Sequence, residues 1–440
     1  MNNISLKPLW GVIFWCFSLH TAEAQNLLNL DEALKMALEQ NHAITISKNR
    51  EAISQNNATM GNAGLLPSIG VNGGYQYSLS NTKAEYFGSI PPVDVTGAGS
   101  NTYNASATLR YTLFDGLAVF YNYDKLKEIA VLSEVQSRQN IENTLVQVIS
   151  AYYNVAAFQE DLAIAREALN ISKVRIERTE NQVKYGQATG LNLLNTQVNY
   201  NADSTLVINT KLQLVNAIRN LQFLLGDANT GDTLIVSNEL SLQNNLIYDD
   251  LWQKAQSNNA AVRLAQYNGN TANLDLKIAQ AARFPQVLGT VSYSYNNQIN
   301  DAGFLLSNQN NGLSAGVSVN FNLFNGGQTN TRIKNAQINA ENIALSLDQI
   351  QQQVAVELQN AYNRYTTNKQ LLQLQEENLQ FAQSNFDRSK QLADLGQITN
   401  LDFREAQLNL IRAKNAISDA KYQSKISEFE LLRIAGILLE

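Results

Sequence analysis

Side chains that could perform chemistry are few and scattered in this sequence. It has two histidines, of which only His42 lies beyond the first 24 residues, and one cysteine, Cys16, which lies within them. A single imidazole cannot form a metal site or a catalytic triad alone, so we expect His42 at the surface or near a helix terminus. We find no glycine-rich phosphate loop, nucleophile motif or carboxylate dyad. The sequence predicts no enzyme, no cofactor and no metal.

Composition and charge favour an exported protein over one that binds nucleic acid. The formal net charge is −6, and no basic patch stands out. Residues 1–24 are a predicted secretory signal peptide, with Lys7, an apolar stretch over 9–19 and an Ala-Glu-Ala cleavage site at 22–24. Beyond it no apolar run approaches the roughly 18 residues of a membrane-spanning helix. Two classes remain: a soluble periplasmic or secreted protein, and an outer membrane protein built from strands.

The elements that must position any site occur twice along the chain. Gly186 and Gly396 each end a helical pattern at a short polar turn, and they lie 210 residues apart. An internal repeat of this length determines how the rest of the sequence is read. We predict a first repeat over 25–226, a loop-like linker over 227–248 and a second repeat over 249–440. Other pairs at the same offset are Phe114 and Phe324, Gly116 and Gly326, Tyr152 and Tyr362, and Gly226 and Gly436.

Each repeat begins with a helical pattern, over 30–66 and 249–284, which a proline ends. Two segments of strict alternation follow in each repeat. They are predicted strands, at about 68–79 and 103–114, and at about 286–296 and 313–324. Their length matches the roughly 9–11 residues of a tilted membrane strand. The polar segment 80–102 is a predicted exposed loop, and Arg110 falls on the polar face of its strand, which we expect to line a lumen.

Each pair of strands ends in a turn that leads into a helix. The acid or amide of this turn can cap the helix, the glycine lets the backbone turn, and the aromatic residue suits a membrane-interface belt. The two motifs are Leu113-Phe114-Asp115-Gly116 and Leu323-Phe324-Asn325-Gly326.

A very long helix is predicted after each turn. About 70 residues without proline reach Gly186 and Gly396, which corresponds to about 105 Å of helix. Between residues 141 and 183, apolar side chains recur every 3.5 residues with a few polar interruptions. That spacing is typical of coiled-coil packing.

Four strands per chain are too few for a membrane barrel, because single-chain barrels start at about eight strands. An open sheet edge is not tolerated in lipid. If the alternating segments cross a membrane, several chains must share one barrel, and three copies give twelve strands. The fold class is then an α+β membrane protein with a two-fold internal repeat. It combines a long antiparallel coiled-coil tunnel with four strands per chain of a trimeric 12-stranded outer membrane barrel.

Taken together, these motifs resemble the TolC-type outer membrane efflux proteins, the outer membrane factor family, over essentially the whole chain after the signal. The resemblance rests on Leu66-Pro67 and Phe284-Pro285 before strands, on the two strand-to-helix turns, and on a Gly-x-x-x-x-Leu turn in each repeat. It implies a homotrimer in the outer membrane, in contact with its lipid, with a long periplasmic portion. It also implies a passive exit duct that works with a periplasmic adaptor and an inner-membrane transporter. Adaptor docking would use the helix–turn–helix tips, at Gly186, Leu191, Gly396 and Leu401.

The resemblance further implies an acidic constriction at the periplasmic entrance, six and nine residues after the second tip glycine. Asp402 and Glu405 occupy these positions, whereas the first repeat has Asn192 and Asn195. The alternative is that both acids are ordinary first-turn residues, which the helix dipole favours. The resemblance also points to a departure: two residues after the glycine, where the best-known family member closes its entrance with an arginine, this chain has Ile398.

A second hypothesis is a periplasmic coiled-coil adaptor that forms no pore. The apolar strand faces, with their Tyr, Val and Leu side chains, favour exposure to lipid over this alternative. The sequence does not choose between drug efflux and type I protein secretion, because the pump selects the cargo.

Overall fold

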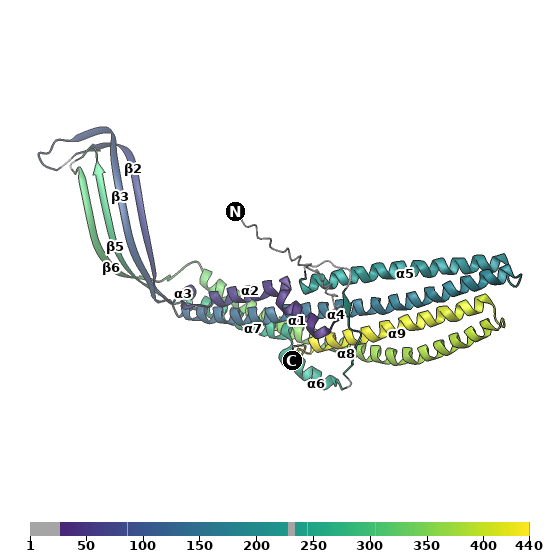
Figure 1. Cartoon of the computed structure of the whole chain (residues 1–440). Coiled ribbons are helices and arrows are strands. Elements are labelled where there is room, and N and C mark those ends of the chain that lie inside the picture. Colours follow the sequence, from purple (N-terminus) through teal and green to yellow (C-terminus); the bar gives the residue numbers. More distant parts are fainter. Residues whose placement is uncertain (1–26, 86, 228–233, 244, 304, 440) are drawn as a thin grey trace, which may run out of the picture.

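The molecule is elongated: a curved four-stranded sheet lies at one end, the tips of two long helical hairpins lie at the other, and shorter helices lie between them (Figure 1). This computed structural model describes residues 27–85, 87–227, 234–243, 245–303 and 305–439. The predicted signal peptide lies outside these residues. The combination of long helices with a four-stranded sheet confirms the predicted α+β class.

The sheet contains β2 (Ser68–Ala84), β3 (Val93–Phe114), β5 (Gln286–Asn300) and β6 (Ser307–Asn320), which pair antiparallel in that order. Its register keeps the two faces distinct across all four strands. One row of paired residues is apolar: Ile69, Leu109, Val291 and Ala315. The adjacent row is Ser68, Arg110, Thr290 and Gly316, which places Arg110 on the polar face as predicted.

The strands extend further outward than predicted. Most of the expected loop over 80–102 is strand, because β2 continues to Ala84 and β3 starts at Val93. Polar pairs such as Lys83 with Asp94 continue the ladder beyond the apolar band. Side-chain polarity marked the end of that band, whereas backbone pairing decides where a strand ends. For the same reason β5 reaches Asn300, and β6 is shifted to 307–320 from the predicted 313–324.

The hairpins consist of α4 (Ala118–Lys184) with α5 (Gly190–Leu225), and of α8 (Gln328–Asp394) with α9 (Asn400–Ile434). Both α4 and α8 have 67 residues, or about 100 Å of continuous helix, as predicted. The four helices lie in the order α5, α4, α9, α8, so that α4 and α9 join the two hairpins (Figure 1). Among the described residues, no helix is both long and apolar enough to cross a membrane.

Coiled-coil packing is confirmed in the middle of α4, between residues 145 and 162. The apolar positions read from the spacing are buried there, and an aromatic cluster with α9 extends them. These positions are Leu145, Val148, Tyr152, Val155 and Leu162.

Short helices surround the middle of the molecule. The predicted helix over 30–66 is three helices, α1 (Leu30–Gln40), α2 (His42–Asn57) and α3 (Met60–Ala63). In the second repeat the predicted helix over 249–284 is likewise interrupted, and the break at Asn259 separates α6 (Tyr248–Asn258) from α7 (Ala260–Ala281). His42 is the exposed first residue of α2.

An asparagine accounts for this break in both repeats. Asn41 and Asn259 each accept backbone N–H groups of the next helix. Their amide nitrogens donate to the last carbonyls of α5 and α9, at 2.6 Å for Leu224 O and 2.8 Å for Ile434 O. The same capping residue therefore fixes a short helix to a long one twice.

The linker is less loop-like than predicted. Within it β4 (Ile235–Val236) pairs in parallel with β1 (Leu27–Leu28). Further along, Ser241 O accepts from Lys425 Nζ at 2.7 Å. These contacts hold the linker against the helical body.

Candidate functional site at the tips of the helical hairpins

Both hairpin tips turn at a left-handed glycine, as the repeat predicted. Gly186 has φ +72° and Gly396 has φ +71°, and the residue after each donates its N–H back into the ending helix. Thr189 and Thr399 then cap the returning helices. The leucines of these turns, Leu191 and Leu401, are 66% and 76% exposed. Their docking role stays a prediction.

Asp402 has a structural role in the second tip. It completes a capping box: the Thr399 N–H donates to Asp402 Oδ2 at 3.0 Å, and the Asp402 N–H donates to Thr399 Oγ1 at 3.2 Å. The Thr399 hydroxyl donates to the same carboxylate at 2.6 Å. These hydrogen bonds, the hydroxyl's first, lower the pKa of Asp402 below its ordinary value. Asp402 and Glu405 are both exposed, so the structure leaves them free to face an aqueous channel.

Ile398 belongs to an apolar cluster. It packs against Phe386, Phe403 and Leu410, which join α8 to α9 just above the tip. Ile398 thus helps to fasten α8 to α9 by apolar packing, and Ile171 of α4 joins the same cluster.

Arginines of α4 hold the second tip instead. Arg178 forms an ion pair with Asp394 and donates to Ala393 O at 2.9 Å and to Asp394 O at 3.1 Å. Arg175 donates to Asn400 O at 3.1 Å, and its guanidinium lies 5.1 Å from the centre of the Phe403 ring. Both arginines therefore bridge from the first repeat to the turn between α8 and α9.

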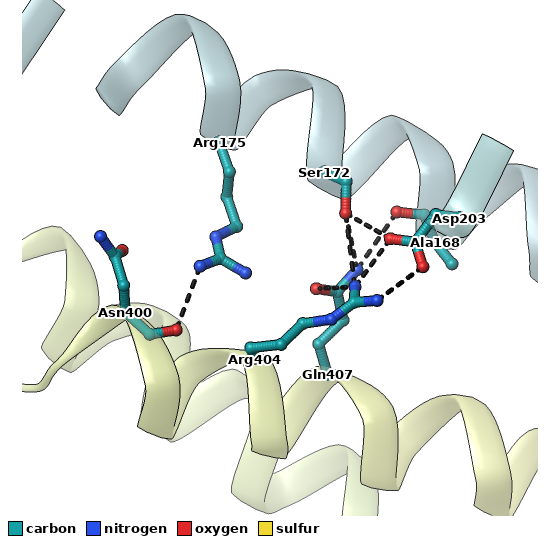
Figure 2. A network of polar contacts seen from close by, with 7 residues as sticks. All are labelled: Ala168, Ser172, Arg175, Asp203, Asn400, Arg404 and Gln407. Carbon is teal, nitrogen blue, oxygen red and sulfur yellow. Dashed lines mark hydrogen bonds and ion pairs between the residues drawn. The ribbon is translucent and has the colours of Figure 1, made fainter. Parts of the chain in front are cut away.

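A buried ion pair lies on the same seam, further from the tips (Figure 2). Arg404 of α9 donates twice to Asp203 of α5, with both N–O distances 2.7 Å. Their side chains are only 10% and 4% exposed. Ser172 of α4 donates to Asp203, and Gln407 connects Arg404 to Ala168 O of α4 at 3.1 Å. Three helices from both hairpins thus share one polar network.

Burial and a neighbouring positive charge both act on Arg175. The pKa of Arg175 is lowered to about 10 by burial and by neighbouring Arg404, with Asp203 opposing the shift. The guanidinium thus stays charged near neutral pH. A bidentate, hydrogen-bonded pair compensates the cost of burying both charges, but either charge left alone would be strongly unfavourable.

This network was not predicted, although the sequence contains a signal for it. Thr196, Asp203 and Thr210 lie seven residues apart along α5 and are all buried. A carboxylate in the seam of a coiled coil calls for a partner. The internal repeat gives no indication of that partner, because neither residue of the pair is charged in the other repeat: Arg404 corresponds to Leu194 and Asp203 to Ala413.

The strand-to-helix junctions differ between the repeats in one respect. The N-cap positions are Leu117 and Gly327, but the predicted residues two places earlier still bond to the first turn: Asp115 Oδ2 accepts from the Val119 N–H at 3.0 Å and Asn325 Oδ1 from the Thr329 N–H at 3.4 Å. At Gly116 (φ +72°), a Cβ would lie 2.6 Å from Ala281 O.

Gly326 (φ +66°) has the same backbone conformation but open space around it. Correspondingly, Phe114 packs edge-on against Phe284, whereas Phe324 is 86% exposed. The second junction lacks, within one chain, the neighbour that the first one has. The membrane-belt role of both phenylalanines stays a prediction.

Among the residues that the structure describes, no three His, Cys, Asp or Glu side chains cluster as metal ligands would.

Known proteins share this architecture and sequence pattern. The outer membrane efflux protein family matches residues 33–227 and 251–437. The outer membrane protein TolC of Escherichia coli K12 is 20% identical over 384 residues, which cover 86% of this chain and 76% of TolC. The alkaline protease secretion protein AprF of Pseudomonas aeruginosa is 23% identical over 446 residues, 99% of this chain and 90% of AprF.

The fold also matches solved structures. The CmeC outer membrane channel of Campylobacter jejuni superposes with a TM-score of 0.78 at 15% identity, over 100% of this chain and 94% of CmeC. These matches argue against the alternative of a periplasmic adaptor without a pore. The chain belongs to the outer membrane efflux protein family, which confirms the predicted exit duct and its place in the outer membrane.

Proposed function

We propose that three copies of this chain close one duct, through which cargo leaves the periplasm without catalysis by the duct itself. The sheet supports this assembly most directly. Its outer strands, β2 and β6, have no strand partner on their outer edges among the described residues. None of the described helices covers either face, so apolar side chains such as Val71 and Leu313 are largely exposed in one chain. Lipid would cover the apolar side chains, and strand pairing between copies would satisfy the backbone groups on the outer edges of β2 and β6.

The internal repeat indicates how the helices of neighbouring copies meet. Within one chain α4 packs against α9. Their counterparts in the other repeat are α8 and α5, which form the two uncovered edges of the helical layer (Figure 1). On α5, exposed Leu194 and Leu212 occupy the positions of Arg404 and Tyr422, the α9 residues that contact α4. We place α5 of one copy on α8 of the next, in a head-to-tail arrangement that closes a ring.

The open space at Gly326 supports the same ring. At the first junction, Phe284 and Ala281 of the second repeat fill the space beside Gly116. Their counterparts before the first strands are Leu66 and Ala63. In a ring, these residues of the next copy would fill the space beside Gly326.

At the periplasmic entrance, we assign two roles to residues of the tips. Three copies of Asp402 and Glu405 form an acidic constriction, in which a narrow aqueous pore concentrates negative potential and favours cations. The exposed turns around Leu191 and Leu401 dock a periplasmic adaptor, and an inner-membrane transporter supplies energy and selects cargo. The chain covers most of both TolC and AprF, the latter a protease secretion protein, so drug efflux and protein secretion are both open.

The observation that carries this proposal is that both the sheet and the helical layer end in two uncovered edges, at β2 and β6 and at α5 and α8. Cysteines at Leu194 and Ala382 test it, because these positions correspond to Arg404 and Ser172, which touch within one chain. The predicted mature chain contains no cysteine, so the background is clean. A short bismaleimide should join the pair between copies in membranes and give covalent dimers and trimers.

A matched control places the second cysteine at Ile338, an exposed α8 residue far from the predicted contact. Equal cross-linking of both pairs, or products confined to single chains, would refute the arrangement.

A further inference from the structure

Three unpartnered oxygen atoms lie along the helices that join the two hairpins, α4 and α9. They are Asp161 Oδ1 on α4, and Asn415 Oδ1 and Ser418 Oγ on α9, all buried and without a hydrogen-bond partner. Ser418 is completely buried. It faces the Asp161 carboxyl without reaching hydrogen-bond geometry. Buried polar atoms are nearly always paired, so this cluster calls for a physical reason.

The basic side chains nearby are committed to other acids. Lys421 lies 3.6 Å from Glu160, which also accepts from the Tyr422 hydroxyl at 2.9 Å. Lys414 forms a 2.6 Å ion pair with Glu167.

The other elements bring no positive charge into the cluster. Asp419 of α9 is another acid, and its charge acts on Asp161 in the same direction as that of Glu160. Helix α5 runs antiparallel to α4, and Asp203 of α5 faces Ser172 of α4. Eleven residues further along α5, Leu214 therefore lies opposite Asp161. The nearest charged residue of α5, Lys211, is exposed. The linker strand β4 has only Ile235 and Val236. Asp161 is therefore a half-buried carboxyl whose Oδ1 is fully buried, beside like charges and with no ion pair among the residues that the structure describes.

These surroundings favour the neutral carboxylic acid. Burial first, then the charges of Asp419 and Glu160, raise the pKa of Asp161 from 3.8 to about 6, against a smaller lowering by Ser418. A protonated carboxyl also adds an O–H donor beside Ser418, whose hydroxyl oxygen can accept as well as donate.

We propose that Asp161 is a proton-binding residue whose ionisation controls how tightly α4 and α9 pack. When Asp161 binds a proton, the seam loses a buried charge and gains a donor, so the two hairpins hold together more firmly. Because the folded-state pKa is raised, the stabilisation is complete below pH about 4 and is lost as pH rises through about 6. This device does not depend on the proposed duct, since it concerns contacts within one chain.

Hydrogen exchange of the full-length protein in detergent tests the proposal. Asp161→Asn removes the charge at nearly constant shape. Wild type and variant are compared at the same pH, so that the chemical exchange rate cancels. At about pH 7.5 we expect residues 157–168 and 411–422 to exchange up to about a hundredfold more slowly in the variant; the difference should shrink steadily as the pH is lowered and vanish below about pH 4. Glu167→Gln is the control, because it removes a paired acid of the same seam and should not slow exchange.

A second variant keeps the proposal testable if Asp161→Asn folds poorly. Ser418→Ala removes the neighbour that lowers the pKa of Asp161, so the pH midpoint of wild-type protection should move upward. A variant that exchanges no more slowly than wild type at pH 7.5, or a difference independent of pH, would overturn the proposal. Protection that rises at constant pH when sodium or calcium chloride is added would also overturn it, in favour of a bound cation.

Discussion

Breaking the Arg404–Asp203 pair should separate the two hairpins of a chain. Asp203→Ala leaves the Arg404 guanidinium buried with only Gln407 and Ser172 as partners. Removing one member of a buried ion pair costs about 3–5 kcal/mol, because the other charge is left uncompensated. At 1.36 kcal/mol per tenfold change, the equilibrium for separating α9 from α4 and α5 shifts by roughly two to four orders of magnitude.

The double variant Arg404→Leu with Asp203→Ala distinguishes two contributions to the loss of stability: the lost ion-pair attraction and the burial of one uncompensated charge. It installs the residues found at the corresponding positions of the other repeat, Leu194 and Ala413. Without an unpaired charge, we expect it to be clearly more stable than either single variant. Arg364→Met is the exposed control. It removes a 3.0 Å pair with Glu430 whose side chains are 59% and 34% exposed, and should cost at most about 1 kcal/mol.

Planar bilayer recordings, with hydrogen exchange of α9 in parallel, measure the effect. Asp203→Ala should raise the time that the channel spends at its high-conductance level and speed exchange around residue 404. Moderate salt should not reproduce this effect, because buried pairs are poorly screened. If Asp203→Ala conducts and exchanges like Arg364→Met, the network does not hold the hairpins together. If the double variant is as unstable as the single one, the explanation by an uncompensated charge is wrong.

Three further results are expected. Asp402→Ala with Glu405→Ala should reduce cation selectivity and block by multivalent cations in bilayers; unchanged selectivity would leave both acids with local roles only. Gly116→Ala should destabilise the chain by more than the roughly 1–2 kcal/mol of a left-handed backbone, since its Cβ meets Ala281 O. Gly326→Ala should mainly weaken the trimer, and equal thermal shifts of the two variants would contradict the ring. A short tag inserted after Gly88, between β2 and β3, should bind antibody on intact cells; a tag reached only after the outer membrane is broken would reverse the topology.

Repetition made the architecture predictable from the sequence. Each landmark occurs twice at one offset, so weak local signals such as the turns at Gly186 and Gly396 support each other. Helix length, tip geometry and the two sheet faces follow from local rules of periodicity and capping, and the structure confirms them. Strand ends were predicted less well, because polar pairs such as Lys83 with Asp94 extend a ladder without an apolar signal.

The contacts between the hairpins could not be predicted in the same way. Arg404 and Asp203 lie 201 residues apart and have no charged counterparts in the other repeat. Asp402 could be placed near the entrance only by resemblance, whereas its capping hydrogen bonds follow from Thr399 three residues earlier. Tertiary partners of this kind depend on which helices become neighbours, and a single sequence does not encode that locally.

The mass of the purified particle in mild detergent, measured by native mass spectrometry, tests the central claim most directly. Four strands per chain and two uncovered edges predict three copies, which supply twelve strands to one barrel and six hairpins to one tunnel. A particle of three chains would agree with this account. A stable monomer recovered without detergent, or a particle with another number of copies, would contradict it.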